Sequence, residues 1–522
     1  MNMRKYYDLL ALRRSKRLLL SNTKTSLTES HGFLRHPITS PPPPPPSPSP
    51  PSFYSQIYKN TYRNIVSHHR LHPTRSNHTT NHRHFQLSNP HTSELATSLP
   101  DDHEDTSLLD YQVTVKGREV ISADVTLGTH HWLPLSNLDL LLPPVAVGVF
   151  FCYKKKDNVN MSYETVVKTI KASLGGVLST FYPLAGEIVE NRQGEPEVVC
   201  NNRGVEFIEA RADIELKDLD FFHPDDSVKG KLVPKINGGV VAIQATELNC
   251  GSIIISGVFN HQLADAYSIN MFLRAWAQYT RKESITNTPS FRPSVLNPRH
   301  PPFFTTSIDK LYIPISSLPP PSSFEEPLLG RMYYIHGESI AKLQSEASTE
   351  DTKRSKLLSF TAFLWKLLAH KDGDTTSRMG IVVNGRRFLA ESGEKDSPLL
   401  GNHFGNATNE EHFRELIDWV ELQRPNTTVA RIYFGLKKSE GEAVVVSAGQ
   451  GLPVKDMDFG WGKPEFGSYH FPWGSRTGYI STMPSGKKNG DWVVYMHLKE
   501  EDFNLIDSMA PNVFTPLTYY HI

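Results

Sequence analysis

An apolar run followed by a helical pattern, with a polar pair at the junction, most constrains the fold of this chain. The run Ile253–Phe259 is apolar and has the length of a buried strand. Apolar residues then recur at helical spacing through Ala266–Arg281. His261 and Asp265 stand between the two elements, four residues apart. Burying polar groups at such a junction costs free energy unless they are paired, so the pair indicates a specific role.

A second pair with the same spacing shows that spacing alone carries little weight. His370 and Asp374 lie in a stretch rich in Asp, Gly, Thr and Ser, which is typical of a solvated loop. His261, by contrast, is flanked by apolar elements. A histidine titrates near neutral pH, so His261 can act as a general base, with Asp265 orienting its ring or holding the local backbone. The alternative is a core histidine whose hydrogen bonds are satisfied.

The composition changes near residue 107. Residues 1–93 hold 13 Lys or Arg and 2 Asp or Glu, whereas the remainder holds 42 basic and 53 acidic residues. The proline run Pro41–Pro46 and the polar stretch His68–Ser93 cannot bury enough apolar surface to fold, so we expect residues 1–107 to be disordered. The basic start resembles an organelle transit peptide. We favour an extension without a targeting role, because Pro and His tracts are unusual in such peptides.

Bulk properties argue against several classes of protein. An acidic folded region argues against a nucleic-acid partner. Cys152, Cys200 and Cys250 are far apart and give no disulfide framework or zinc spacing. We therefore expect a cytoplasmic location, with an organelle as the alternative if the basic start is a transit peptide. No apolar window approaches ~18 residues, so we expect no membrane span.

Strand-like and helical patterns alternate irregularly from about Tyr111 onward, which predicts an α/β or α+β body. A Pro-rich stretch at 287–324 indicates a linker, so we predict an N-terminal domain at 108–286 and a C-terminal domain at 325–522. We predict strands at Val113–Val115, Val145–Tyr153, Val240–Thr246, Ile253–Phe259, Ile381–Val383, Ala443–Ser447 and Trp492–His497, and helices at Tyr163–Phe181, Ala266–Arg281, Ser339–Glu346, Ser359–Leu368 and Asp502–Met509.

A second motif follows His261 by about 200 residues and consists of Asp458, Phe459, Gly460, Trp461 and Gly462. Glycines beside an indole permit a tight backbone path and close packing, so the residues alone indicate a structural turn. The motif is too short for a phosphate-binding glycine loop. Arg386 follows another predicted strand and is either a solvated turn residue or the partner of a buried carboxylate.

Other catalytic arrangements are missing from the sequence. It holds no Gly-x-Ser-x-Gly motif and no cysteine beside a histidine. It holds no His-Glu-x-x-His motif and no paired Cys-x-x-Cys motif. We therefore expect no bound metal or cofactor. A direct transfer without a covalent enzyme intermediate is the simplest enzymatic interpretation.

The two motifs, in this order, resemble those of the plant BAHD acyl-CoA-dependent acyltransferases. The resemblance covers about Tyr111 to Ile522, and its longer strings look most like the coniferyl alcohol acyltransferase branch. It implies a two-domain chloramphenicol acetyltransferase-like fold with a channel between the domains. Acyl-CoA would enter from one side and a small alcohol from the other. The strings are Trp132–Pro144, Phe181–Glu187, Cys200–Val205, Leu296–Pro302, Phe466–Gly474 and Asn489–Met496.

The resemblance also implies residue roles. His261 would be the general base in mid-channel, and Asp265, the second candidate catalytic residue, would point away from the substrate and pair with Arg386. The motif Asp458–Gly462 would be structural and away from the chemistry. Acyl-CoA would be a co-substrate with no other cofactor bound, and the enzyme would be a monomer.

The chain departs from the family pattern in two places. After Asn402–Asn406, relatives carry roughly thirty further residues, a strand and a helix by pattern, before the helix that here includes His412–Glu421. That segment is missing near 406–410, so we expect this chain to fold less stably than its relatives. Relatives that use shikimate carry an arginine where this chain has Gly451, which favours a neutral alcohol as acceptor.

These observations lead to one main prediction and two alternatives. We predict transfer of an acyl group from acyl-CoA to the hydroxyl of a phenylpropanoid alcohol such as coniferyl alcohol, with His261 as the base. The same base would also support N-acylation of an amine. A non-catalytic relative acting as a protein partner is the third interpretation, which the missing segment favours and the intact His261 and Asp265 oppose.

Overall fold

The computed structural model describes residues 110–522 except 127, 129–130, 143, 156–161, 292–295, 319–326, 370–376, 390–403, 406–408, 434–442, 473–476 and 488–489. The expected disordered extension at 1–107 and the pair His370 and Asp374 lie outside the described residues. Among the described helices, none has the length and apolar character needed to cross a bilayer.

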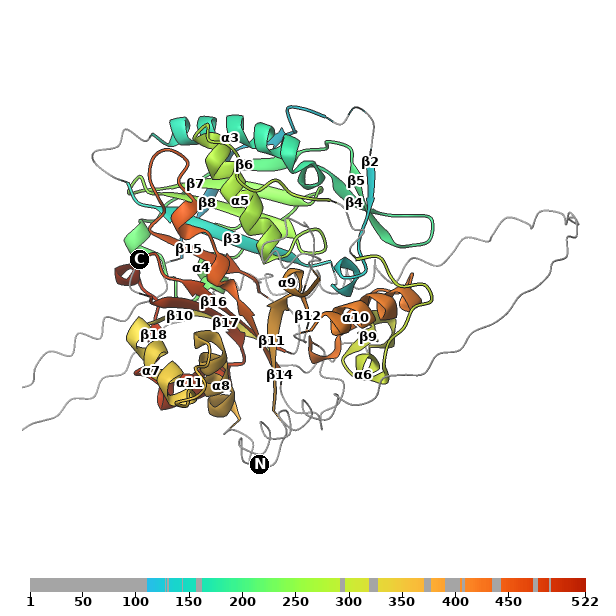
Figure 1. The fold of residues 1–522 in the computed structure, drawn as a ribbon. Helices are drawn as coiled ribbons and strands as arrows, with labels where there is room; N and C mark the ends of the chain where they lie inside the picture. Colours follow the sequence, from blue (N-terminus) through green and yellow to red (C-terminus); the bar gives the residue numbers. More distant parts are fainter. Residues whose placement is uncertain are drawn as a thin grey trace, which may run out of the picture. The chain divides into compact units, whose positions relative to one another are not determined.

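The first sheet has six strands in the order β1-β6-β7-β8-β3-β15, and helices α3 and α5 cover one of its faces (Figure 1). Trp276 of α5 donates its indole N–H to the carbonyl of Ile170 and to the hydroxyl of Ser173 on α3, at 3.3 and 3.0 Å. The elements are β1 (Val113–Ile121), β3 (Ala146–Tyr153), α3 (Tyr163–Thr180), β6 (Val205–Ala212), β7 (Val241–Leu248), β8 (Ile253–Asn260), α5 (Ala266–Thr280) and β15 (Phe466–His470).

The second sheet has seven strands in the order β12-β11-β14-β16-β17-β10-β18. Helices α7, α8 and α11 bury their apolar faces against it in a separate core that includes Ile340, Phe360 and Phe503 (Figure 1). The elements are β10 (Leu329–Ile335), α7 (Gly337–Ala347), α8 (Lys356–Leu368), β11 (Arg378–Asn384), β12 (Phe404–Gly405), β14 (Ala443–Ala448), β16 (Gly478–Pro484), β17 (Trp492–Leu498), α11 (Glu500–Met509) and β18 (Thr515–Pro516).

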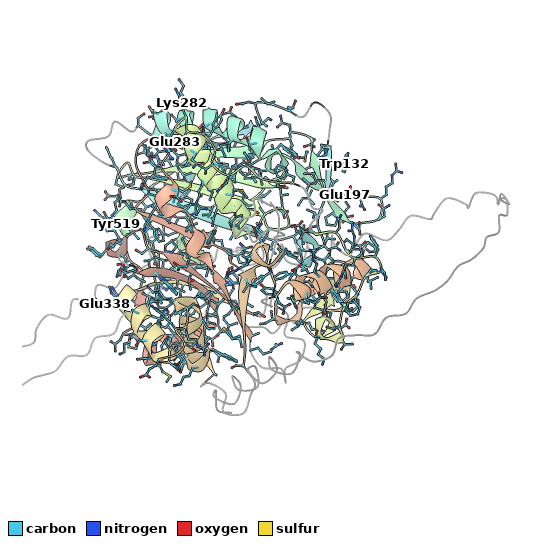
Figure 2. The ribbon with its side chains drawn as sticks, in the orientation of Figure 1. Trp132, Glu197, Lys282, Glu283, Glu338 and Tyr519 are labelled. Atoms are coloured by element: carbon cyan, nitrogen blue, oxygen red, sulfur yellow. The ribbon has the colours of Figure 1, made fainter. Side chains whose placement is uncertain are left out.

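Short elements fill the rest of the described chain. A small sheet in the order β2-β5-β4 carries Trp132 and Glu197 (Figure 2), and β9 pairs with β13. These elements are β2 (His131–Pro134), β4 (Glu187–Glu190), β5 (Pro196–Cys200), α4 (Pro224–Ser227), α6 (Thr306–Asp309), β9 (Tyr312–Pro314), α9 (Arg386–Leu389), α10 (Glu410–Gln423) and β13 (Thr428–Ala430).

The strand β15 belongs to the first sheet although it lies in the range predicted for the C-terminal domain. It pairs with β3 over five residues, from Phe466 opposite Cys152 to His470 opposite Gly148. Aromatic packing accounts for the crossing, because Phe466 lies edge-on to Phe150 and Phe221 at 5.7 and 5.2 Å. The predicted ranges 108–286 and 325–522 therefore separate the two sheets except at this strand.

The stretch predicted as a linker is partly packed. Within 287–324, β9 pairs with β13, and Arg299 donates to both oxygens of the buried Asp418 on α10. Leu296 and Ile308 are buried as well. These contacts attach the described part of 287–324 to α10. It is therefore an ordered part of the fold and not a flexible linker.

Candidate active site

His261 follows directly on β8. Its backbone N–H donates to the carbonyl of Val145 at 2.8 Å, which fixes the turn against the start of β3. Its ring lies edge-on to Phe471, with 5.9 Å between ring centroids. The residue is half-buried. A strand end, a backbone hydrogen bond and an aromatic contact thus position an imidazole that remains partly accessible.

Asp265 begins the helix α5 as its N-cap. One carboxylate oxygen accepts the backbone N–H and the hydroxyl of Ser268, both at 2.9 Å. This contact satisfies an amide that the first helical turn leaves unpaired, and the negative charge lies at the positive end of the helix dipole. The four-residue spacing from His261 is therefore the length of the turn between β8 and α5.

Arg386 forms a two-pronged ion pair with Asp265. Its Nη1 lies 2.7 Å from Oδ2 and its Nη2 lies 3.1 Å from Oδ1, while Nη2 also donates to the hydroxyl of Ser268. Arg386 is 1% exposed, and its guanidinium lies over the ring of Tyr267 at 4.4 Å. The expected pairing is therefore present in the structure, and it joins the second half of the chain to the first.

The two candidate catalytic residues differ in their contacts and in their exposure. Both oxygens of Asp265 are engaged by Arg386 and Ser268, which leaves its charge neutralised inside the protein. His261 precedes this braced turn and keeps part of its ring accessible. These contacts therefore hold the turn that follows β8 at Val145 and at Arg386.

The motif Asp458–Gly462 packs at the other end of α5, which Lys282 and Glu283 mark in Figure 2. Asp458 accepts the backbone N–H groups of Gly460 and Gly462 at 2.8 and 2.9 Å, and both glycines have φ above +110°, which disfavours other residues. Phe459 lies edge-on to Trp276 at 5.0 Å and stacks on Trp461. These contacts close the turn and hold it against α5.

Gly451 lies against α5 one turn beyond the braced Asp265. Its carbonyl accepts from the side chains of Asn270 and Arg274, both at 3.0 Å. Tyr469 donates its hydroxyl to Asn270 at 2.7 Å. Burial, more than any charge, raises the pKa of Tyr469, so its hydroxyl stays protonated and can keep donating. A side chain added at Gly451 would meet Asn270 at an ordinary 3.5 Å, so sterics leave this place open.

Reasoning from the residues alone missed Asn270, Tyr469 and Phe471. The string Phe466–Gly474 carried the family resemblance, but its spacing gives no sign that it reaches His261. Only the pairing of β15 with β3 brings Phe471 to that ring. Within the described ranges, no cluster of three or more His, Cys, Asp or Glu side chains could hold a metal ion.

Comparison with protein families gives one match over most of the folded chain. The model of the Transferase family matches residues 111–408 and 397–511. The match thus comes in two pieces that meet at 397–408. The missing segment is expected near 406–410, at the end of this overlap.

Individual relatives are distant but cover most of their own length. A hydroxycinnamoyltransferase of Narcissus pseudonarcissus is 24% identical over 417 residues, which is 70% of this chain and 92% of that protein. An omega-hydroxypalmitate O-feruloyl transferase of Arabidopsis thaliana is 26% identical over 376 residues, 63% of this chain and 78% of that protein. An acetyl-CoA-benzylalcohol acetyltransferase of Clarkia breweri is 24% identical over 414 residues, covering 69% and 90%.

Solved structures show the same fold. Vinorine synthase superposes with a TM-score of 0.57 at 22% identity, covering 78% of this chain and 99% of that one. TRI101 of F. graminearum, crystallised with coenzyme A and deoxynivalenol, gives 0.58 at 14% identity, covering 74% and 99%. The expected chloramphenicol acetyltransferase-like α/β fold is therefore confirmed.

Proposed function

Because the chain belongs to the Transferase family, the family of the BAHD acyltransferases, we propose that it acylates the hydroxyl of a phenylpropanoid alcohol. The family makes the chain an acyl-CoA-dependent acyltransferase. Coniferyl alcohol is the acceptor to test first, since the longer strings look most like that branch. The relatives named for hydroxycinnamoyl and benzyl alcohol transfer support an aromatic substrate.

His261 would act as the general base of the reaction. It removes the proton of the acceptor hydroxyl while that oxygen attacks the thioester carbonyl of acyl-CoA. The tetrahedral oxyanion that forms needs hydrogen-bond donors and then collapses. The carbon–sulfur bond breaks, and the imidazolium returns its proton to the leaving CoA thiolate. The products are an ester and free CoA, and His261 ends in its starting state.

Asp265 and Arg386 would serve the reaction by holding the turn that carries His261. Their ion pair is buried and bidentate, and Asp265 also caps α5. Removing either partner leaves the other charge buried without compensation. We therefore assign both residues a positioning role, although the sequence also allows Asp265 a catalytic one.

A neutral acceptor is supported by the surroundings of Gly451. Its carbonyl is held by Asn270 and Arg274, and no side chain of its own can pair with a carboxylate there. No further charge is needed at this place for a neutral alcohol.

We propose that the protein is a monomer located in the cytoplasm, with a channel between a domain at 108–286 and a domain at 325–522.

The observation that carries this proposal is the partly accessible His261 on a turn braced by Asp265 and Arg386. The test is release of CoA thiol by the full chain with acetyl-CoA and coniferyl alcohol. We expect release from the wild type and loss of at least about a thousandfold in His261→Ala. His131→Ala, which removes an exposed imidazole elsewhere, is the matched control and should keep full activity.

Other outcomes separate the alternatives. Release with an aromatic amine but not with coniferyl alcohol would establish N-acylation instead. Equal rates of CoA thiol release by the wild type and by His261→Ala would show that His261 is not the base. A folded wild type without release on any alcohol or amine would favour the non-catalytic interpretation, and repeating the assay after restoring the missing segment would test whether its loss is the cause.

A further inference from the structure

Two buried polar side chains lie between the two sheets without hydrogen bonds of normal geometry. His470 of β15 is 3% exposed, and neither of its ring nitrogens has a partner among the described residues. Tyr495 of β17 is fully buried, and its hydroxyl is likewise unpaired. Their rings lie edge-on, with 5.8 Å between centroids. Three buried hydrogen-bonding atoms on two neighbouring rings are therefore unpaired.

Leaving such atoms unpaired costs free energy, so their presence needs a reason. Burial, the largest effect, lowers the pKa of His470 to about 4. The imidazole is therefore neutral at pH 7, with one N–H donor and one strong acceptor nitrogen. Burial raises the pKa of Tyr495 well above its ordinary value, so its hydroxyl stays a donor and acceptor.

These groups are linked to the candidate base through Phe471. Phe471 follows His470 in the chain, and its ring is the one against which His261 lies at 5.9 Å. The backbone N–H of Phe471 faces the Tyr495 hydroxyl and lowers its pKa, against the larger effect of burial, without reaching hydrogen-bond geometry. The unpaired atoms are thus one residue away from the ring that contacts His261.

Close packing fixes where His470 lies. A side chain at Gly148, opposite His470 on β3, would come within 2.7 Å of Val233 and 3.0 Å of the His470 carbonyl. The glycine lets β15 lie tightly on β3. On β17, Tyr495 is held opposite Ser481 of β16. Both hydrogen-bonding groups are therefore mounted on strands rather than loops.

We infer that His470 and Tyr495 bind the phenolic hydroxyl of the acceptor and so determine its specificity. The inference rests on the proposed function. A phenol is a strong hydrogen-bond donor, and a neutral imidazole is a matching acceptor. The Tyr495 hydroxyl supplies a second partner. In a coniferyl-type alcohol the phenol is at the opposite end of the molecule from the reacting hydroxyl, so the aromatic ring would lie along Phe471 while the side chain reaches His261.

The test compares two alcohols that differ at the phenol. Coniferyl alcohol carries the hydroxyl and cinnamyl alcohol lacks it. The wild type should prefer coniferyl alcohol in kcat/KM by more than about tenfold, because a site built around a hydroxyl rejects the analogue without it. His470→Phe and Tyr495→Phe should each remove most of this preference by lowering kcat/KM for coniferyl alcohol alone.

Tyr479→Phe is the matched control. The ring of Tyr479 also packs on Phe471, at 5.0 Å, and burial raises the pKa of its hydroxyl while Ser447 opposes the increase. This variant should keep the wild-type preference. A thermal melt of each variant establishes folding, and Tyr495→Phe, which removes one oxygen, keeps the test valid if His470→Phe does not fold.

Three results would overturn the inference while leaving the proposed function intact. The first is a wild type that acylates both alcohols equally well. The second is a pair of variants that slow both alcohols by the same factor. The third is a pair of variants that melt at higher temperature with an unchanged preference, which would mean that the unpaired atoms only lower stability and bind no acceptor. Absence of any acylation by the wild type would instead count against the proposed function.

Discussion

The strands β8 and β11 each deliver one residue of the candidate site, but the protein covers them very differently. β8 is hydrogen-bonded on both sides, to β7 and β3, and seven of its eight residues are buried before it delivers His261. β11 pairs with β14 on one side, and on the other side the described pairing with β12 reaches only Val383 and Asn384. No residue of β11 is fully buried.

The difference locates the weak part of the molecule. The strand that leads to the candidate base His261 is paired on both sides, whereas the strand that leads to Arg386 is half-buried near the end of the other sheet. The two pieces of the family match meet at 397–408, in the connection that follows β11. We therefore expect that the segment that relatives carry, and that this chain lacks, would cover β11. Its absence should weaken the position of Arg386 more than that of His261.

The largest expected effect comes from removing the brace itself. Arg386→Ala leaves Asp265 buried without its partner and should lower the free energy of unfolding by about 3–5 kcal/mol. Arg424→Ala is the matched control, since Arg424 makes the same two-pronged contact with Glu195 but is more exposed. It should cost about 1 kcal/mol or less. Urea unfolding measures both, and equal losses would contradict the assigned importance of the Asp265 pair.

In the six-stranded sheet, His470 should make the free energy of unfolding depend on pH. Burial lowers its pKa to about 4, with Asp225 opposing and Lys229 and His497 adding to the decrease. Between its unfolded pKa of ~6.5 and 4, the unfolded chain binds a proton that the folded chain does not, so stability falls as pH falls. The loss attributable to this residue should approach about 3 kcal/mol near pH 4.

Comparing the wild type with His470→Phe isolates this contribution from that of the carboxylates. The difference in unfolding free energy between the two proteins should change between pH 7 and pH 4.5 and stay constant above pH 7. A difference that is flat across the whole range would show that folding leaves the pKa of His470 at its unfolded value.

The same substitution, Ile to Ala, made in β8 and in β11 compares how well the two strands are buried. Ile255 of β8 is 1% exposed, whereas Ile381 of β11 is half-buried. Ile255→Ala should cost about 2–5 kcal/mol and Ile381→Ala about half of that or less, since the cost follows the buried volume that is lost. Similar costs measured by denaturant unfolding would mean that β11 is covered as well as β8.

Restoring the missing segment should have the smallest effect on the stability of the whole molecule, because it would bury only the strand β11. We expect a rise of a few degrees in the melting temperature and no change in the behaviour of Ile255→Ala. Ile381→Ala should become more costly in the restored protein than in the natural chain. An unchanged melting temperature would show that the shortened connection is fully accommodated.

Local patterns in the sequence predicted the individual elements better than their arrangement. The strand β8, the helix α5 and the turn between them follow from apolar periodicity and an N-cap aspartate, which are properties of neighbouring residues. The contact of Phe471 with His261 depends on β15 pairing with β3, more than 300 residues earlier in the chain. No local pattern reports such pairing. The bond between Arg386 and Asp265 was expected only through the family resemblance.

The crossing of β15 has a consequence for anyone exchanging parts between related enzymes. A fragment ending in the crossover would leave the β3 edge, with Phe150 and Cys152, open to pairing with other chains. The transplantable module is therefore discontinuous, comprising 111–286 together with 466–472. Chimeras cut only at the crossover would mix strands of two parents within a single sheet, and the mixed strand leads to Phe471, which contacts the candidate base.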